Sequence, residues 1–135
     1  MAQLSWTNEL STGIAEQDEQ HKTLIDLINR LNSAIQKGSD REIVGPVLTE
    51  LVGYAVYHFG YEEELMSRHD YADTSAHKSE HEKFIETLDE FKKKFSVGDE
   101  VISVHVINFL RMWVTGHIMK TDKKMGLELS KNAAT

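Results

Sequence analysis

Apolar residues recur along most of this chain at alternating steps of three and four positions, which is the period of one face of an α-helix. The clearest run has steps of 4, 3, 4, 3 and 4, and its members are His77, His81, Phe84, Leu88, Phe91 and Phe95. Three further runs repeat the pattern, within residues 21–35, 48–65 and 106–117. Each run predicts one amphipathic helix with a narrow stripe that faces a core.

Short stretches rich in polar residues and glycine separate the four predicted helices, at Gly38–Asp40, His69–Ala72 and Gly98–Asp99. Short connections between long helices favour antiparallel neighbours. The sequence therefore predicts an all-α fold, an antiparallel up-down-up-down four-helix bundle. We expect residues 1–135 to form a single domain.

The two ends of the chain do not follow the helical period well. Residues 1–17 are expected to form an irregular N-terminal arm that packs onto the bundle through Leu4 and Trp6. Residues 128–135 are expected to be a frayed tail, because terminal segments are poorly ordered unless packing holds them in place.

Composition narrows the classes of function. The formal net charge is −7 and there is no long basic run, so binding to nucleic acid is not expected. No apolar stretch approaches the roughly 20 residues needed to span a bilayer, and the N-terminus resembles neither a signal nor a transit peptide. These features predict a cytoplasmic protein, and the surface charge favours a monomer. The chain has no cysteine, so nitrogen and oxygen atoms must hold any metal ion.

Five of the seven histidines fall on the predicted core stripes, and all four helices contribute: His21, His58, His77, His81 and His117. The other two do not, since one lies in a loop and one lies about 120° away from its stripe: His69 and His105. A single buried histidine is usually an ordinary core residue with a hydrogen-bond partner. Five are different, because each unpartnered imidazole costs about 1–3 kcal/mol and a domain is stable by only ~5–15 kcal/mol. A metal centre would convert these costs into bonds.

Two carboxylates extend the same pattern. Glu62 follows His58 by four residues, so both side chains can point at one site. Asp122 follows His117 by five residues, which a regular α-helix would rotate by about 140°. We therefore expect this turn to widen into a π-type bulge or to unwind, so that Asp122 points inward. Glu63 is expected to be solvated.

The number of donor atoms suggests two metal ions. Five imidazoles and two bridging carboxylates supply nine contacts, and an oxide or hydroxide bridge supplies two more. Two octahedral ions need twelve, so one position stays open for a small ligand.

The order of these motifs strongly resembles the hemerythrin family, and is closest to its bacterial single-domain members. The chain has one histidine on the first predicted helix, then His-x-x-x-Glu, His-x-x-x-His and His-x-x-x-x-Asp on the next three. The resemblance extends from Trp6 and the DEQH run at residues 18–21 to Asp122, and none of the seven ligand positions departs from it.

The resemblance implies two non-haem iron ions with an oxo or hydroxo bridge, which bind O2 reversibly for storage, transport or delivery. The protein would be an oxygen carrier rather than an enzyme, and an oxygen-consuming enzyme could receive the O2. One iron would be held by His77, His81 and His117 and the open iron by His21 and His58, with Glu62 and Asp122 as bridges. The implied oxygen pocket is lined by Phe59, Trp113, Val114 and Ile118.

The sequence is also compatible in part with two other functions. The HKSEH stretch at residues 77–81 matches the H-x-x-E-H pattern of certain zinc peptidases, but that function would leave three core histidines unexplained. A di-iron redox enzyme or sensor, which handles peroxide, nitric oxide or iron, could use the same centre and stays the alternative. Reversible binding is favoured because five of the seven expected ligands are neutral, and higher-valent iron would concentrate positive charge in a dry interior.

Overall fold

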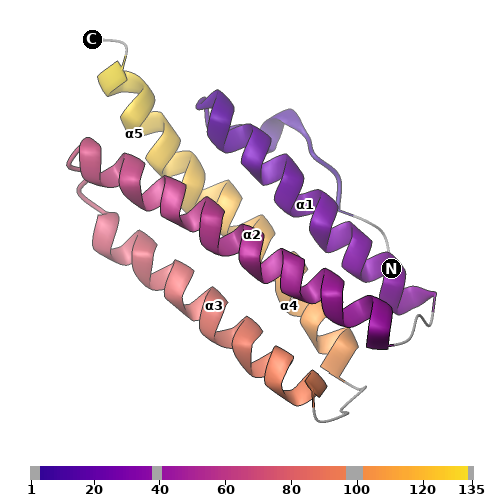
Figure 1. Cartoon of the computed structure of the whole chain (residues 1–135). Coiled ribbons are helices and arrows are strands. Elements are labelled where there is room, and N and C mark those ends of the chain that lie inside the picture. The colour runs from indigo at the N-terminus through magenta and orange to yellow at the C-terminus, as the bar shows by residue number, and fades with distance from the viewer. Residues whose placement is uncertain (1–3, 38–40, 97–101, 134–135) are drawn as a thin grey trace.

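The computed structural model describes residues 4–37, 41–96 and 102–133. The described part of the chain is helical and contains no β-strand. Successive helices run in opposite directions, and the fourth helical segment packs against both the first and the third (Figure 1). The predicted up-down-up-down bundle is confirmed. Two of the expected connections, Gly38–Asp40 and Gly98–Asp99, lie outside the described residues.

The first three long helices match the three predicted runs, and the fourth predicted helix is a continuous segment of three parts. The first three are α1 (Ala15–Gln36), α2 (Arg41–Arg68) and α3 (Thr74–Ser96). The fourth segment consists of α4 (Ile102–Gly116), a π-helical turn η2 (His117–Asp122) and α5 (Lys123–Ala133). This π turn is the only π segment among the described residues.

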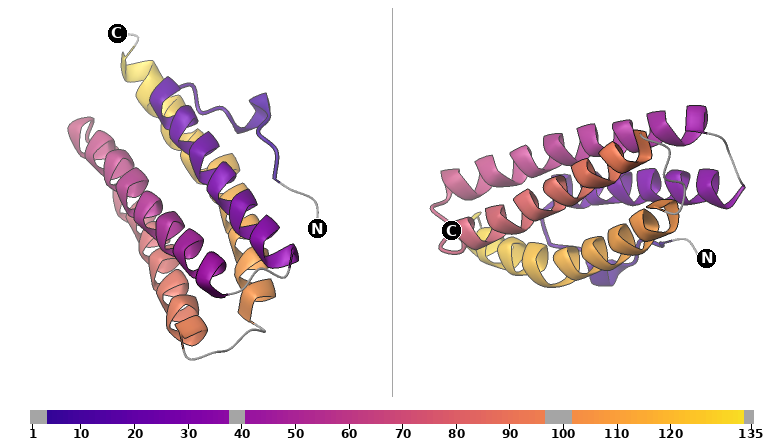
Figure 2. Two further views of the ribbon diagram at one scale, coloured as in Figure 1. Left: turned by 45° about the vertical axis from the view of Figure 1, so that its right-hand side comes forward. Right: turned by 90° about the horizontal axis from the view of Figure 1, so that it is seen from below.

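The N-terminal arm is shorter than expected. Helix α1 begins at Ala15, and a short 3-10 turn, η1 (Asn8–Leu10), precedes it. The early start follows from Asp18, whose carboxylate accepts hydrogen bonds from the Thr12 backbone N–H at 2.9 Å and from Ser11 Oγ at 2.6 Å. An acidic side chain in the first turn also suits the positive end of the helix dipole. The arm lies along α1 and α4, as the further views show (Figure 2).

The prediction of a frayed tail is wrong for residues 128–133, which continue α5. Leu129 is one turn after Met125 on the same helix face, and both are buried against Met66 of α2. This second small core holds the last turns of α5 onto the bundle. Residues 134–135 lie outside the described part of the chain.

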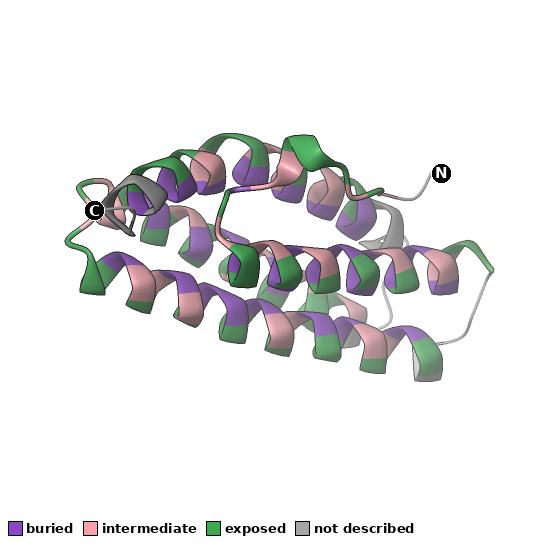
Figure 3. Cartoon of the chain, turned by 90° about the horizontal axis from the view of Figure 1, so that it is seen from above, coloured by how far each residue is buried: buried purple, intermediate pink, exposed green. Residues whose placement is uncertain are grey.

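The main core consists of apolar side chains from all four helical segments, and the buried faces of the helices turn toward one another (Figure 3). Leu51, Phe84, Leu88 and Leu110 have no exposed surface. Burying such side chains contributes about 1.5–3 kcal/mol each. Between this core and the smaller one around Met66, the interior is polar.

Candidate metal centre

All seven sequence-predicted ligand residues meet in this polar interior. Their exposed fractions are 4% or less, and they come from every helical segment: His21 on α1, His58 and Glu62 on α2, His77 and His81 on α3, and His117 and Asp122 on the π turn. Charged and polar residues are seldom buried so fully unless they are paired or bind a metal. The helical period of the sequence was enough to predict the inward position of six of them, and only Asp122 required a widened turn.

The seven residues form two overlapping groups, and in each group the potential ligand atoms lie within 4.8 Å of one another. The first group is Glu62, His77, His81, His117 and Asp122, and the second is His21, His58, Glu62 and Asp122. The two carboxylates belong to both groups. This is the arrangement expected of two neighbouring cation positions that share two bridging ligands.

The π turn explains how Asp122 joins the centre. A π-helix brings residues five apart in the chain onto one face, whereas an α-helix brings residues three or four apart together. Asp122 Oδ1 lies 3.1 Å from Nε2 of His117, and Asp122 has no exposed surface. The widened turn expected between these two residues is confirmed.

Polar atoms at the centre crowd together without forming a full set of hydrogen bonds. His81 Nε2 lies 3.0 Å from Glu62 Oε1, yet neither atom has a hydrogen-bond partner. The same is true of other buried atoms here: His77 Nε2, His117 Nε2, Asp122 Oδ1 and Asp122 Oδ2. Each unsatisfied buried group costs about 1–3 kcal/mol. These nitrogen and oxygen atoms face one another at short distances but do not form hydrogen bonds. A metal ion between them would bind several at once, so the residues present fit bound metal ions.

Three of the imidazoles are oriented by hydrogen bonds on their outer side. Nδ1 of His58 donates to Oε1 of Gln20 at 2.7 Å. Nδ1 of His81 donates to Glu63 at 3.0 Å, and Nδ1 of His117 donates to Glu80 at 2.8 Å. A proton fixed on Nδ1 leaves the Nε2 lone pair free and directed inward, which is the tautomer that a metal ligand needs.

These outer partners were not found by sequence reasoning. Glu63 was expected to be solvated, but its carboxylate turns toward His81. Gln17 is also buried, and its Nε2 donates to Oε2 of Glu62 at 2.8 Å. The position of Gln17 could have been predicted, since it lies four residues before His21 and therefore on the same stripe. The positions of the acidic partners could not, because a glutamate beside a core stripe is usually exposed.

The charges at the centre shift the pKa values of its histidines and carboxyl groups. Burial alone would lower the pKa of the three imidazoles nearest Asp122, because it penalises their charged form. The negative charge and close contact of Asp122 and Glu62 outweigh this effect. The pKa is raised to about 9 for His21 and His77 and to about 10 for His117. Conversely, the pKa of both carboxyl groups is lowered well below the usual range, although burial opposes the shift. Positive charge is therefore favoured at this site.

The expected pocket residues fall into two pairs. Phe59 stacks on His81 with ring centroids 3.9 Å apart, and Trp113 stacks on His117 at 4.2 Å. Both aromatic rings therefore lie against the three-histidine group. Val114 and Ile118 are buried and line a cavity of about 270 Å³ under the N-terminal arm.

The two histidines that were expected to lie off the core stripes, His69 and His105, lie apart from the centre. His69 follows the end of α2 and is exposed, and His105 is exposed on α4. Neither belongs to either ligand group of the described residues. Among the helices of the described part, none is long and apolar enough to cross a membrane.

The fold and site define a four-helix-bundle protein with a buried centre for metal ions. Residues 12–127 match the Hemerythrin HHE cation binding domain. The chain belongs to the hemerythrin family, and its histidine and carboxylate cluster is a non-haem iron site.

Similar proteins cover most of the chain. A bacteriohemerythrin of Methylococcus capsulatus is 39% identical over 131 residues, which are 96% of this chain and 99% of that protein. A bacteriohemerythrin of Pseudomonas aeruginosa is 38% identical over 122 residues, 90% of this chain and 78% of that protein. A wild-type hemerythrin crystal structure superimposes with a TM-score of 0.89 at 38% identity, covering 96% of this chain and 99% of the other.

Proposed function

We propose that this protein is a cytoplasmic oxygen carrier that binds O2 reversibly at two iron ions. In this proposal residues 1–135 act as one hemerythrin-like domain and as a monomer. The observation that supports it most is the pair of overlapping ligand groups, which share both carboxylates. O2 binding is the function that the family implies.

The two groups of potential ligand atoms support the following ligand set. One iron would be held by the three histidines of the first group, and the other by the two histidines of the second: His77, His81 and His117, then His21 and His58. Glu62 and Asp122, which belong to both groups, would be shared by the two ions. The ion with two histidines would have fewer protein donors, so O2 would bind there. The iron ions would supply the electrons on which reversible O2 binding depends.

Residues around the centre hold its side chains in place and keep it away from solvent. Gln20, Glu63 and Glu80 fix the imidazole rings from outside, and Gln17 holds one oxygen of Glu62. Burial of the whole ligand set excludes water and protons, which would otherwise help bound O2 to leave in a reduced form. These features favour a carrier over a di-iron redox enzyme or sensor.

Absorption of the purified protein in air and then under argon, with iron and protein quantified on the same sample, tests this function. The expected result is two irons per chain and a visible band that appears in air and disappears under argon over repeated cycles. A spectrum that changes once and does not return would contradict reversible binding. One zinc and no iron after expression in iron-replete medium would contradict the metal assignment.

A further inference from the structure

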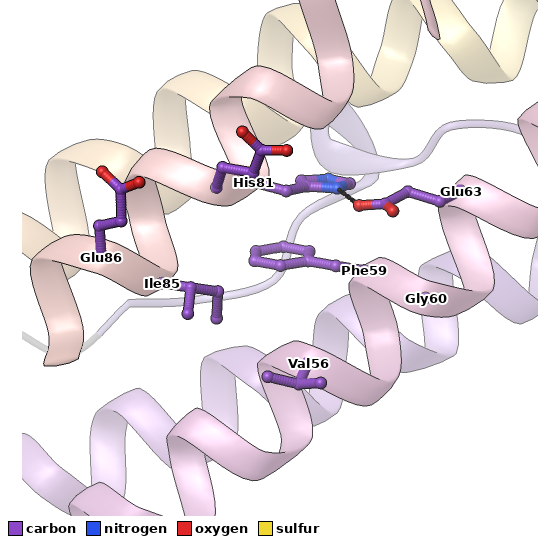
Figure 4. A pocket seen from close by; sticks show the side chains of 8 residues that line it. Val56, Phe59, Gly60, Glu63, His81, Ile85 and Glu86 are labelled. Carbon is purple, nitrogen blue, oxygen red and sulfur yellow. Dashed lines mark hydrogen bonds and ion pairs between the residues drawn. The ribbon is translucent and has the colours of Figure 1, made fainter. Parts of the chain in front are cut away.

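A groove between α2 and α3 reaches from the surface to the back of the metal centre. It has a volume of about 450 Å³, and it is lined by Val56, Phe59, Gly60, Glu63, His81, Glu82, Ile85 and Glu86. Figure 4 shows Val56, Phe59 and Ile85 on its apolar side and the contact between Glu63 and His81 at its inner end. An outside molecule in this groove would be separated from the centre by one ligand residue.

The groove is acidic as well as apolar. Three carboxylates line it, from Glu63, Glu82 and Glu86, and no lysine or arginine does. The side chains of Glu82 and Glu86 lie on exposed positions of α3, where they can meet solvent. Carboxylates around an apolar floor are complementary to a positively charged surface with an apolar centre. Such charge complementarity mainly steers encounter and fixes orientation.

Two contacts join the groove to a metal ligand. The Phe59 ring lies parallel to the His81 ring, with an interplanar angle of 8° and centroids 3.9 Å apart. Glu63 accepts the Nδ1–H of His81 while 31% of its side chain stays exposed. A donor in the groove would therefore lie close to the first ligand group through a stacked ring and a hydrogen bond.

We infer that this groove is the docking site of a basic one-electron donor protein, which returns ferric iron to the ferrous state. The inference rests on the proposed function, because only ferrous iron takes up O2 and every carrier that loses reduced oxygen is left ferric. Each transfer moves one electron from the donor to one ferric ion, and two transfers restore the pair; no bond forms or breaks. A small acidic surface next to the metal centre suits such a transient redox encounter.

The chain offers variants that change the groove without touching the ligands. Glu82→Gln with Glu86→Gln removes two of its three negative charges. Gly60→Leu adds an apolar side chain to the groove lining, and its Cβ would meet nothing within 4 Å. The matched control is Asp26→Asn with Glu128→Gln, which changes the net charge equally on exposed positions of α1 and α5.

The first experiment follows reduction of the ferric protein by stopped-flow absorption at low ionic strength. Reduced methyl viologen serves as the cationic donor and dithionite as the anionic one. The glutamine pair should slow the viologen reaction by about tenfold, within the range that electrostatic steering supplies. Gly60→Leu should slow the same reaction because its side chain occupies the groove. Dithionite is an anion that the carboxylates do not attract, so the glutamine pair should not slow its reaction. Equal viologen rates in parent and groove variants would overturn the inference.

The second experiment needs no iron chemistry. The ¹⁵N-labelled, zinc-loaded protein is titrated with cytochrome c, a basic haem protein, and amide shifts are mapped. Shifts should gather at Gly60, Glu63, Glu82 and Glu86, fade at high salt and disappear in the glutamine pair. Shifts spread evenly over other acidic surface would overturn the docking site. If these results hold while the air and argon cycles fail, the groove is right and the carrier function is wrong.

Discussion

Asp122 Oδ1 lies 3.1 Å from Nε2 of His117, although five residues separate the two in the chain. The π turn makes this contact, and it also places Asp122 2.9 Å from Nε2 of His21 on α1. The carboxylate therefore connects the fourth helical segment to the first and belongs to both ligand groups. Its loss should affect both metal positions.

Replacing Asp122 with Asn removes one negative charge and the second oxygen donor of the bridge. We expect Asp122→Asn to bind one iron or fewer per chain, as measured by elemental analysis of protein loaded with excess ferrous iron. The control is His69→Gln with His105→Gln, which removes two imidazoles outside the centre and should keep two irons. A full complement of iron in Asp122→Asn would refute the bridging role.

Trp113 shields the three-histidine group, because its indole stacks on His117. Trp113→Leu should keep two irons and the oxygen-dependent colour, but autoxidise several-fold faster, since a smaller side chain admits water and anions. Time-resolved absorption in air measures the rate. The neighbouring Met112 is 78% exposed, so Met112→Ala should match the parent. An unchanged lifetime in Trp113→Leu would remove this residue from the pocket.

Metal uptake should release protons. The raised pKa values of His21, His77 and His117, about 9, 9 and 10, mean that all three imidazoles are protonated in metal-free protein at pH 7.5. Metal ligands must be deprotonated, so loading should release up to three protons per chain and affinity should rise as pH increases toward 9. Calorimetric titration in buffers of different ionisation enthalpy counts these protons. Release of none would contradict the protonation state.

The same shifts set the pH dependence of the metal-free bundle. An imidazole with a raised pKa stabilises the fold fully below its unfolded value of about 6.5, and this contribution is lost as pH rises through 9 to 10. The two carboxylates have lowered pKa values, so they stabilise above about pH 4 and their contribution is lost in acid. Melting temperature of chelated protein should therefore fall on both sides of neutrality. A flat profile from pH 6 to 10 would contradict this.

Metal removal should destabilise the bundle. Ions that bind only the folded chain stabilise it by mass action, and without them several buried nitrogen and oxygen atoms of the centre have no hydrogen-bond partner. Chelated protein should melt well below iron-loaded protein in a calorimetric scan at pH 7. Equal melting temperatures would indicate a solvated or peripheral site.

The N-terminal arm depends on Gly126 of α5. A Cβ at this position would lie 2.2 Å from the carbonyl oxygen of Thr12, a backbone atom that cannot yield without moving the arm. Gly126→Ala should lower stability by roughly 1–3 kcal/mol, as overpacking does. Gly53→Ala is the matched control, because its Cβ would meet nothing within 4 Å. In that control alanine should stabilise α2 by about 0.5–1 kcal/mol. Urea denaturation compares the two, and equal effects would refute the contact.

The residues that gather at the centre were predictable because one physical rule applies to each of them. When a helix buries an imidazole on its apolar stripe, the sequence shows a histidine at a position where the helical period predicts an apolar residue. Asp122 was the hard case, and only the spacing of five with His117 indicated a π turn. The positions that the sequence did not predict depend on contacts between helices. Glu63 meets His81 across the α2–α3 interface, and Leu129 meets Met66 over a long separation in sequence.

Asp122 also determines when the centre can exist. Both ligand groups require it, and it lies in the last part of the chain, 101 residues after His21. A chain that leaves the ribosome from its N-terminus exposes up to five histidines and Glu62 before either group is complete. The two groups can therefore be complete together only after the last helical segment has been synthesised and has packed against the other helices.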